Sequence, residues 1–351
     1  MPGRTDLIAI APMAAATQHS QIGKTEHRIT HLPVLVLHAH TSCNCRCIMC
    51  DIWKTNESRS LQPADLEPHL TSIRQLGTRW VVFSGGEALL NREWPQLCAI
   101  LKFENIRLTL LTTGLLLQKQ ATQIAESFDD IIISLDGPER IHDEIRGVTG
   151  AFRLMEQGIV AIRKLRPTFN ITARSTVQKA NHAHFRDTVA AAKSLNLNGI
   201  SFLASDLTSE AFNRATPWTE DRQTQIALSF SETQVLEAEI DKLLEENAGD
   251  IATRYIAESP DKLRLIARHF RAHLGLDTTE SPRCNAPWTS AVIETDGSVR
   301  PCFFHRPIGN IHSAPLEELL NGNDALNFRA SLDIATNPTC NRCVCSLNYR
   351  G

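Results

Sequence analysis

The chain has 351 residues, of which 42% are hydrophobic and 21% charged, as in a globular protein with a sizeable core. Its 36 basic and 39 acidic side chains give a net charge of −3, so we expect neither nucleic acid nor membrane as a partner. No apolar run approaches the roughly 20 residues that span a bilayer. Pro12 interrupts the apolar stretch from Leu7 to Ala16, so residues 1–30 are interpreted as an N-terminal extension rather than an export signal.

Six short apolar runs alternate with helical patterns between residues 31 and 210. Apolar residues at helical spacing separate the runs, for example over residues 151–165. Such alternation predicts parallel strands with right-handed crossovers, and six units predict an open, partial (β/α)6 TIM-like barrel. In barrels of this kind the functional residues lie at the C-terminal ends of the strands. The predicted strands cover residues 34–40, 80–86, 108–114, 130–137, 170–178 and 199–206.

Two further regions follow the predicted barrel. Residues 211–281 have a helical pattern and are interpreted as a linker region, in which Ser231 and Gln234 have the spacing of a capping box. Residues 282–351 form a small, cysteine-rich α+β domain that begins with a β-hairpin turning at Asp296-Gly297. The fold class is therefore α/β, with a partial barrel followed by this second domain.

The ten cysteines are clustered along the chain. Nine of them fall into a first cluster, a spaced pair and a final cluster, and the tenth, Cys98, lies in an apolar helical pattern that is typical of a core residue. In a long chain without a convincing export signal, such clustering favours metal ligands over disulfides. Thiolate ligands in turn indicate a reducing, cytoplasmic environment. The nine clustered residues are Cys43, Cys45, Cys47 and Cys50, then Cys284 and Cys302, and finally Cys340, Cys343 and Cys345.

The first cluster directly follows the first predicted strand. Cys43, Cys47 and Cys50 have the spacing C-x3-C-x2-C, so three thiolates converge from one short loop. Three protein ligands on a four-iron cluster leave one iron open, and an open iron can bind a small molecule. The alternative is a structural zinc site or a closed iron–sulfur site in which Cys45 is the fourth ligand.

This motif, at the end of the first strand of a partial barrel, resembles that of the radical S-adenosylmethionine (SAM) superfamily. The resemblance implies a [4Fe–4S] cluster on Cys43, Cys47 and Cys50 that binds SAM. Met49 stands where the family usually carries an aromatic residue near the adenine, and methionine offers a similar soft, apolar contact.

Other strand ends carry residues that match the same family. The second strand ends in Gly85, Gly86 and Glu87, and the resemblance implies that this edge binds the amino group of SAM. It also implies that Ser134, at the end of the fourth strand, and Arg174, in the fifth, hold the ribose and the carboxylate. Two further family-like segments, Thr112-Thr113-Gly114 and Arg146-Gly147, are given no firm role.

The later cysteines resemble the SPASM/twitch class of auxiliary-cluster domains. Cys284, Cys302, Cys340 and Cys343 supply four ligands, and Cys345 is an alternative to Cys343. Because five cysteines are too few for two auxiliary clusters, the resemblance implies one auxiliary [4Fe–4S] cluster of the shorter twitch type. A four-cysteine zinc knuckle is the alternative.

The resemblance implies an enzyme that reductively cleaves SAM to a 5′-deoxyadenosyl radical, which removes hydrogen from a substrate carbon. We expect an oxidative modification of a peptide or small molecule, with a flavodoxin- or ferredoxin-like electron donor. The alternatives are a cofactor-biosynthesis enzyme of the haem or molybdopterin type and a non-catalytic iron–sulfur scaffold or electron carrier. No catalytic acid or base is assigned, although His38, His40 and Asp206 lie near strand ends.

Overall fold

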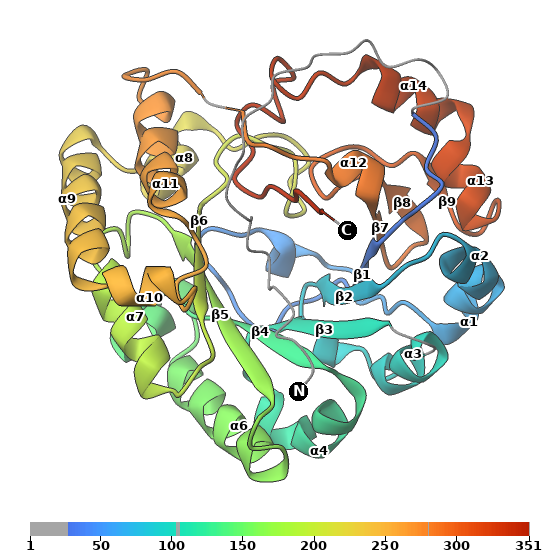
Figure 1. The fold of residues 1–351 in the computed structure, drawn as a ribbon, viewed down its shortest axis with the longest axis horizontal. Helices are drawn as coiled ribbons and strands as arrows, with labels where there is room; N and C mark the ends of the chain where they lie inside the picture. Colours follow the sequence, from blue (N-terminus) through green and yellow to red (C-terminus); the bar gives the residue numbers. More distant parts are fainter. Residues whose placement is uncertain (1–26, 103–105, 280, 351) are drawn as a thin grey trace.

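The computed structural model describes residues 27–102, 106–279 and 281–350, so most of the predicted N-terminal extension lies outside the described residues. Nine strands form one sheet in the order β6-β5-β4-β3-β2-β1-β7-β8-β9. The sheet is not closed (Figure 1). The strands are β1 Val34–His40, β2 Trp80–Gly85, β3 Arg107–Thr112, β4 Asp130–Ser134, β5 Asn170–Val177, β6 Ile200–Ala204, β7 Ser290–Ile293, β8 Ser298–Arg300 and β9 Gly309–Asn310.

The six predicted strands form the parallel part of this sheet, which confirms the partial-barrel fold. Each pairs in parallel with its sequence neighbour, from β1 through β6. Helices between consecutive strands lie around the outside of the curved sheet, as Figure 1 shows. The helices of this part are α1 Pro63–Leu66, α2 Leu70–Gln75, α3 Trp94–Leu101, α4 Leu117–Ser127, α5 Glu139–Arg146, α6 Ala151–Leu165 and α7 Phe185–Ser194.

The hairpin of the C-terminal region continues the barrel's own sheet. β7 pairs in parallel with β1, from Val34 opposite Ser290 to Leu37 opposite Ile293, and β8 then pairs antiparallel with β7. Gly297 forms the predicted turn with a φ of +81°, a conformation that glycine adopts at little cost. The sequence predicted the hairpin but not its pairing with β1. The C-terminal region is thereby fixed directly beside the strand that leads into the first cysteine loop.

The region after β6 is helical, as predicted, but its capping box is not the predicted one. It contains α8 Glu220–Ile226, α9 Phe230–Glu246, α10 Ala248–Ala252 and α11 Pro260–His273, and the later helices are α12 Ala286–Thr289, α13 Leu316–Asn321 and α14 Asn323–Ser331. The predicted pair of Ser231 and Gln234 is wrong. Ser229 and Glu232 form the box instead, because α9 begins at Phe230. None of the helices in the described ranges is long and apolar enough to cross a membrane.

Helix α9 allows a matched test of the core. Leu236 is fully buried, whereas its neighbour Val235 is 46% exposed. Replacing Leu236 with alanine leaves a cavity and should cost about 2–5 kcal/mol in the free energy of unfolding. Val235→Ala should change it by less than about 0.5 kcal/mol. Denaturant unfolding measures both, and equal midpoints for the two variants would contradict this packing of α9 on the barrel.

Candidate functional site

The loop that carries the first cysteines runs over residues 41–51, directly after β1. Its backbone is held by helix α5, because Arg46 N donates to Arg146 O at 2.8 Å and Ile48 N donates to Ile145 O at 3.1 Å. Cys47 is buried, and Cys43 and Cys50 are partly buried. The loop thus presents the predicted thiols from a fixed backbone at the C-terminal edge of the parallel strands.

The thiols of this loop contact one another. Cys45 is buried, and its thiol hydrogen-bonds the thiols of Cys43 and Cys47. The bond with Cys45 lowers the pKa of Cys47 to about 7; the nearby Arg146 guanidinium also lowers it, and burial opposes both. A hydrogen bond with Cys45 also lowers the pKa of Cys43. Since the thiolate is the form that binds metal, these environments favour ligation at Cys43 and Cys47.

No three histidine, cysteine or carboxylate side chains in the described parts of the chain are placed to share a single metal ion. A four-iron cluster has different needs, because each thiolate binds a different iron atom and the sulfur ligands lie farther apart. All ten cysteines lie within the described ranges, and none of them forms a disulfide there. The grouped, unoxidised thiols are therefore available as ligands of an iron–sulfur cluster.

The Gly85-Gly86-Glu87 segment packs closely against the cysteine loop. Gly86 N donates to His40 O at 2.8 Å, and Glu87 N donates to Ser42 O at 2.9 Å. A Cβ on Gly86 would lie 2.1 Å from Ser42 O, so no larger residue fits without moving the loop. The two predicted segments, far apart in sequence, are thus brought into direct contact.

The carboxylate of Glu87 bonds to the protein itself. It is fully buried and accepts hydrogen bonds from Thr112 Oγ1 at 2.9 Å, from Thr113 N at 2.8 Å and from Leu89 N at 3.1 Å. This accounts for the Thr112-Thr113-Gly114 segment, which the sequence singled out without a firm role. Glu87 links the ends of β2 and β3.

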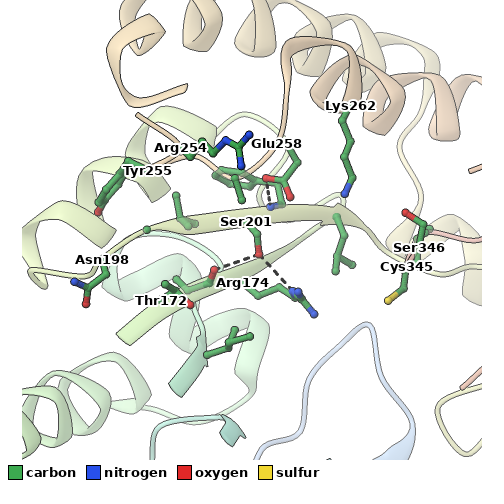
Figure 2. Close-up of a pocket in the computed structure, with 18 of the residues that line it drawn as sticks. Thr172, Arg174, Asn198, Ser201, Arg254, Tyr255, Glu258, Lys262, Cys345 and Ser346 are labelled. Atoms are coloured by element: carbon green, nitrogen blue, oxygen red, sulfur yellow. Dashed lines mark hydrogen bonds between the residues drawn. The ribbon is translucent and has the colours of Figure 1, made fainter. Parts of the chain in front are cut away.

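Ser134 and Arg174 lie side by side on adjacent strands, opposite each other in the register of β4 and β5. The Arg174 side chain lines a cavity of about 150 Å³ between β5, β6 and residues 344–347, and its Nε donates to Ser201 Oγ at 3.4 Å. Figure 2 shows Lys262 and Cys345 around the same cavity. The predicted pair therefore belongs to the interior of the partial barrel.

A second cavity adjoins the first and has a volume of about 830 Å³. It lies between β6, helix α11 and residues 341–346, and Leu203, Glu258 and Lys262 line both cavities. Glu258 accepts a hydrogen bond from Phe202 N at 2.9 Å, and burial raises its pKa. The two cavities share these lining residues, and both lie beside the segment that carries Cys343 and Cys345.

The segment after β6 covers the cysteine loop, which the sequence did not predict. The Trp218 indole nitrogen donates to Asp51 Oδ2 at 2.5 Å, next to Cys50. Arg214 and Arg222 lie against the Trp218 ring, 3.6 and 4.9 Å from its centre, and Arg222 also donates to Ile48 O. These contacts hold the segment against the end of the cysteine loop, beside Cys50.

The three polar residues noted near strand ends all have protein partners. His40 Nδ1 accepts a hydrogen bond from Ser42 N at 2.9 Å, and His38 lies 3.6 Å from Glu294. Asp206 is buried and pairs with Arg214 at 2.5 Å. Their contacts are those of structural residues.

The second set of cysteines also gathers in one place. Burial raises the pKa of Cys302 to about 12, and the nearby thiols of Cys284 and Cys340 contribute to the same rise. Burial raises the pKa of Cys343 too, with contributions from Cys345, Cys302 and Cys284. His305 Nε2 lies 3.2 Å from Cys340 Sγ, a neighbour that the sequence analysis missed. Thiols are soft donors of the kind that iron–sulfur clusters take.

Among curated proteins, the chain is 28% identical to Fe-coproporphyrin III synthase of Methanosarcina barkeri over 156 residues. It is 29% identical to the AdoMet-dependent heme synthase of Oleidesulfovibrio alaskensis over 151 residues. Each alignment covers 42% of this chain and 38% of the relative, so the chain spans less than half the length of these relatives.

Solved structures share the fold. The anSMEcpe structure with bound AdoMet has a TM-score of 0.63 at 20% identity, covering 85% of this chain and 79% of that one. Streptococcus suis SuiB bound to its precursor peptide SuiA has a TM-score of 0.62 at 16% identity, covering 92% and 73%.

Two family profiles match the chain where the geometry places the two cysteine sites. Residues 39–192 match the radical SAM superfamily, and residues 284–344 match the SPASM iron–sulfur cluster-binding domain. The cofactors that go with these families are SAM, a [4Fe–4S] cluster and an auxiliary iron–sulfur cluster. The chain therefore belongs to the radical SAM superfamily, with a SPASM domain following the barrel.

Proposed function

We propose that this chain is a radical SAM enzyme whose Cys43, Cys47 and Cys50 hold the SAM-binding [4Fe–4S] cluster. The observation that carries this function is the direct packing of the cysteine loop on Gly85 and Gly86, at the C-terminal edge of the partial barrel. The bound cofactors supply reductive cleavage of SAM and a 5′-deoxyadenosyl radical that removes hydrogen from a substrate carbon. The protein's residues position the reactants and exclude water.

Within this site, the residues have distinct tasks. The backbone at Gly85 and Gly86 is assigned to bind the amino group of SAM, because this segment packs directly against the cysteine loop. Glu87 acts indirectly, since its carboxylate is used by Thr112 and Thr113. Arg174 and Ser134 hold the carboxylate and ribose from the barrel interior, because both lie on the strands that border the first cavity.

An auxiliary [4Fe–4S] cluster is assigned to Cys284, Cys302, Cys340 and Cys343. Cys343 is preferred to Cys345 as the fourth ligand, because the Cys345 side chain is exposed and that of Cys343 is partly buried. The contact between the two residues is made by the backbone oxygen of Cys345, which accepts a hydrogen bond from Cys343 Sγ at 2.9 Å. With four thiolate ligands this cluster cannot bind substrate directly, so it is assigned to electron transfer. A flavodoxin- or ferredoxin-like protein in the reducing cytoplasm is the proposed donor to the SAM-binding cluster.

The substrate is proposed to reach the barrel through the cavity of about 830 Å³ beside helix α11, and to undergo an oxidative modification. A volume of this size suits a small molecule or one segment of a peptide. A haem-pathway reaction is the second candidate, because the two curated relatives named above act in the synthesis of haem or Fe-coproporphyrin. No acid or base is assigned, since the polar residues at the strand ends are engaged with the protein.

The central test uses chain reconstituted with iron and sulfide without oxygen. About eight irons per chain, the sum of two four-iron clusters, should be bound. After reduction with dithionite, added SAM should yield 5′-deoxyadenosine. The Cys43→Ala/Cys47→Ala/Cys50→Ala variant should retain about four irons and form no deoxyadenosine. Zinc in place of iron, or a wild-type protein that never cleaves SAM, would refute the proposed function. The protein would then be a non-catalytic scaffold or electron carrier.

Gly86→Ala tests the contact between the Gly85-Gly86-Glu87 segment and the cysteine loop. The new Cβ would overlap Ser42 O, so the cysteine loop must move and iron bound at the first site should fall by at least half. The apo-protein should also unfold at a lower temperature than wild type, because the clash does not depend on iron. Gly249→Ala is the control, since a Cβ there meets nothing within 4 Å. Unchanged iron content and melting temperature in Gly86→Ala would rule this packing out.

Single substitutions distinguish the ligands of the auxiliary site. Cys343→Ala should lose about four irons, because a four-iron cluster loses one of its four protein ligands. Cys345→Ala should keep the wild-type iron content and the wild-type visible absorption. The reverse pattern would assign the fourth ligand to Cys345 and overturn this choice.

A further inference from the structure

Helix α5 contacts the cysteine loop through a side chain as well as through its backbone. Arg146, the last residue of α5, is buried, and its Nη1 donates to Cys47 Sγ at 3.6 Å. Its carbonyl oxygen accepts from Arg46 N at 2.8 Å, on the other side of the same loop turn. One residue therefore holds both the backbone and a thiol of the loop.

The guanidinium of Arg146 is itself fixed from the opposite side. Its Nη2 lies 2.5 Å from Asp136 Oδ2, and Asp136 is fully buried. Asp136 Oδ1 accepts from Thr176 N at 2.9 Å, and its backbone oxygen accepts from Asn181 Nδ2 at 3.0 Å. These contacts thus connect the ends of β4 and β5, through Asp136 and Arg146, to the thiol of Cys47.

The residue after Arg146 explains how the helix end approaches so closely. Gly147 has a φ of +63° and ends α5 in the left-handed conformation. A Cβ on Gly147 would lie 2.7 Å from Arg46 O. Any other residue would push α5 away from the loop and lengthen the bond to Cys47. The Arg146-Gly147 pair, which the sequence singled out without a role, is built for this contact.

We propose that Arg146 is a positioning residue that donates a hydrogen bond to the Cys47 sulfur and thereby raises the reduction potential of the SAM-binding cluster. The inference rests on the proposed function, since it takes Cys47 as a ligand. One-electron reduction by an external reductant adds negative charge to the cluster and its thiolates. A donor aimed at one thiolate stabilises the reduced state more than the oxidised state.

The ion pair with Asp136 determines how this effect arises. Asp136 compensates the positive charge of Arg146, so the pair as a whole is neutral. The effect on the cluster therefore comes from the directed N–H bond to sulfur rather than from a net charge. A neutral replacement of the whole pair should consequently remove the effect without leaving a buried, unpaired carboxylate.

The test is a redox titration of the full chain followed by electron paramagnetic resonance. The SAM-binding cluster is identified as the one whose signal changes when SAM is added. In the Asp136→Asn/Arg146→Gln variant its reduction should become about tenfold less favourable, a shift of about 59 mV to lower potential for one electron. The auxiliary cluster should keep its potential. Arg140→Gln is the matched control, because Arg140 lies on the same helix but is exposed and pairs with Glu144.

The outcomes separate this role from a structural one and from the proposed function. An unchanged potential in the double variant, with a SAM-responsive cluster, would overturn the inference and leave the proposed function intact. If the double variant does not assemble the cluster, Arg146→Lys is the second variant. Lysine keeps the ion pair with Asp136 but lacks the planar guanidinium that donates to both Asp136 and Cys47, so the potential of the SAM-binding cluster should again fall. An unchanged potential there would equally overturn the inference. A wild-type chain without a SAM-responsive cluster would overturn both proposals.

Discussion

The candidate site depends on the parallel register between β1 and β2. His38 lies opposite Ser84 and His40 opposite Gly85, so the two strands end together and their following loops must meet. The hydrogen bond from Gly86 N to His40 O then fixes the cysteine loop against the glycine segment. A slip of one residue would turn the side chains of a strand to the other face and separate these loops.

The cysteine loop is held from two further directions. Helix α5 contacts it through the carbonyls of Ile145 and Arg146, and the segment after β6 covers it through Trp218 and Arg222. The pairing of β7 with β1 places the second cysteine domain next to the same strand. One helix end and one covering segment thus hold the first cysteine loop, and the strand order fixes the start of the second cysteine domain beside the strand that leads into it.

Much of this arrangement could be predicted from the sequence, because its signals are local. Buried parallel strands appear as continuous apolar runs, and β1 was predicted with its observed bounds. The capping box was misplaced because Ser229–Glu232 and Ser231–Gln234 both have its spacing, and packing decides between them. The contacts of Arg146 with Cys47 and of Trp218 with Asp51 join residues 99 and 167 positions apart, so no local pattern reports them.

The central claim is that three cysteines bind a [4Fe–4S] cluster and leave one of its irons open. Its most direct test is the electron paramagnetic resonance of the reduced protein before and after SAM addition. It is best carried out in a Cys343→Ala background, in which the auxiliary cluster should be absent. Binding of SAM to an iron without a protein thiolate should change the signal of the remaining cluster. A signal that SAM leaves unchanged would indicate a closed site, and the cysteine loop would then have a structural or electron-transfer role.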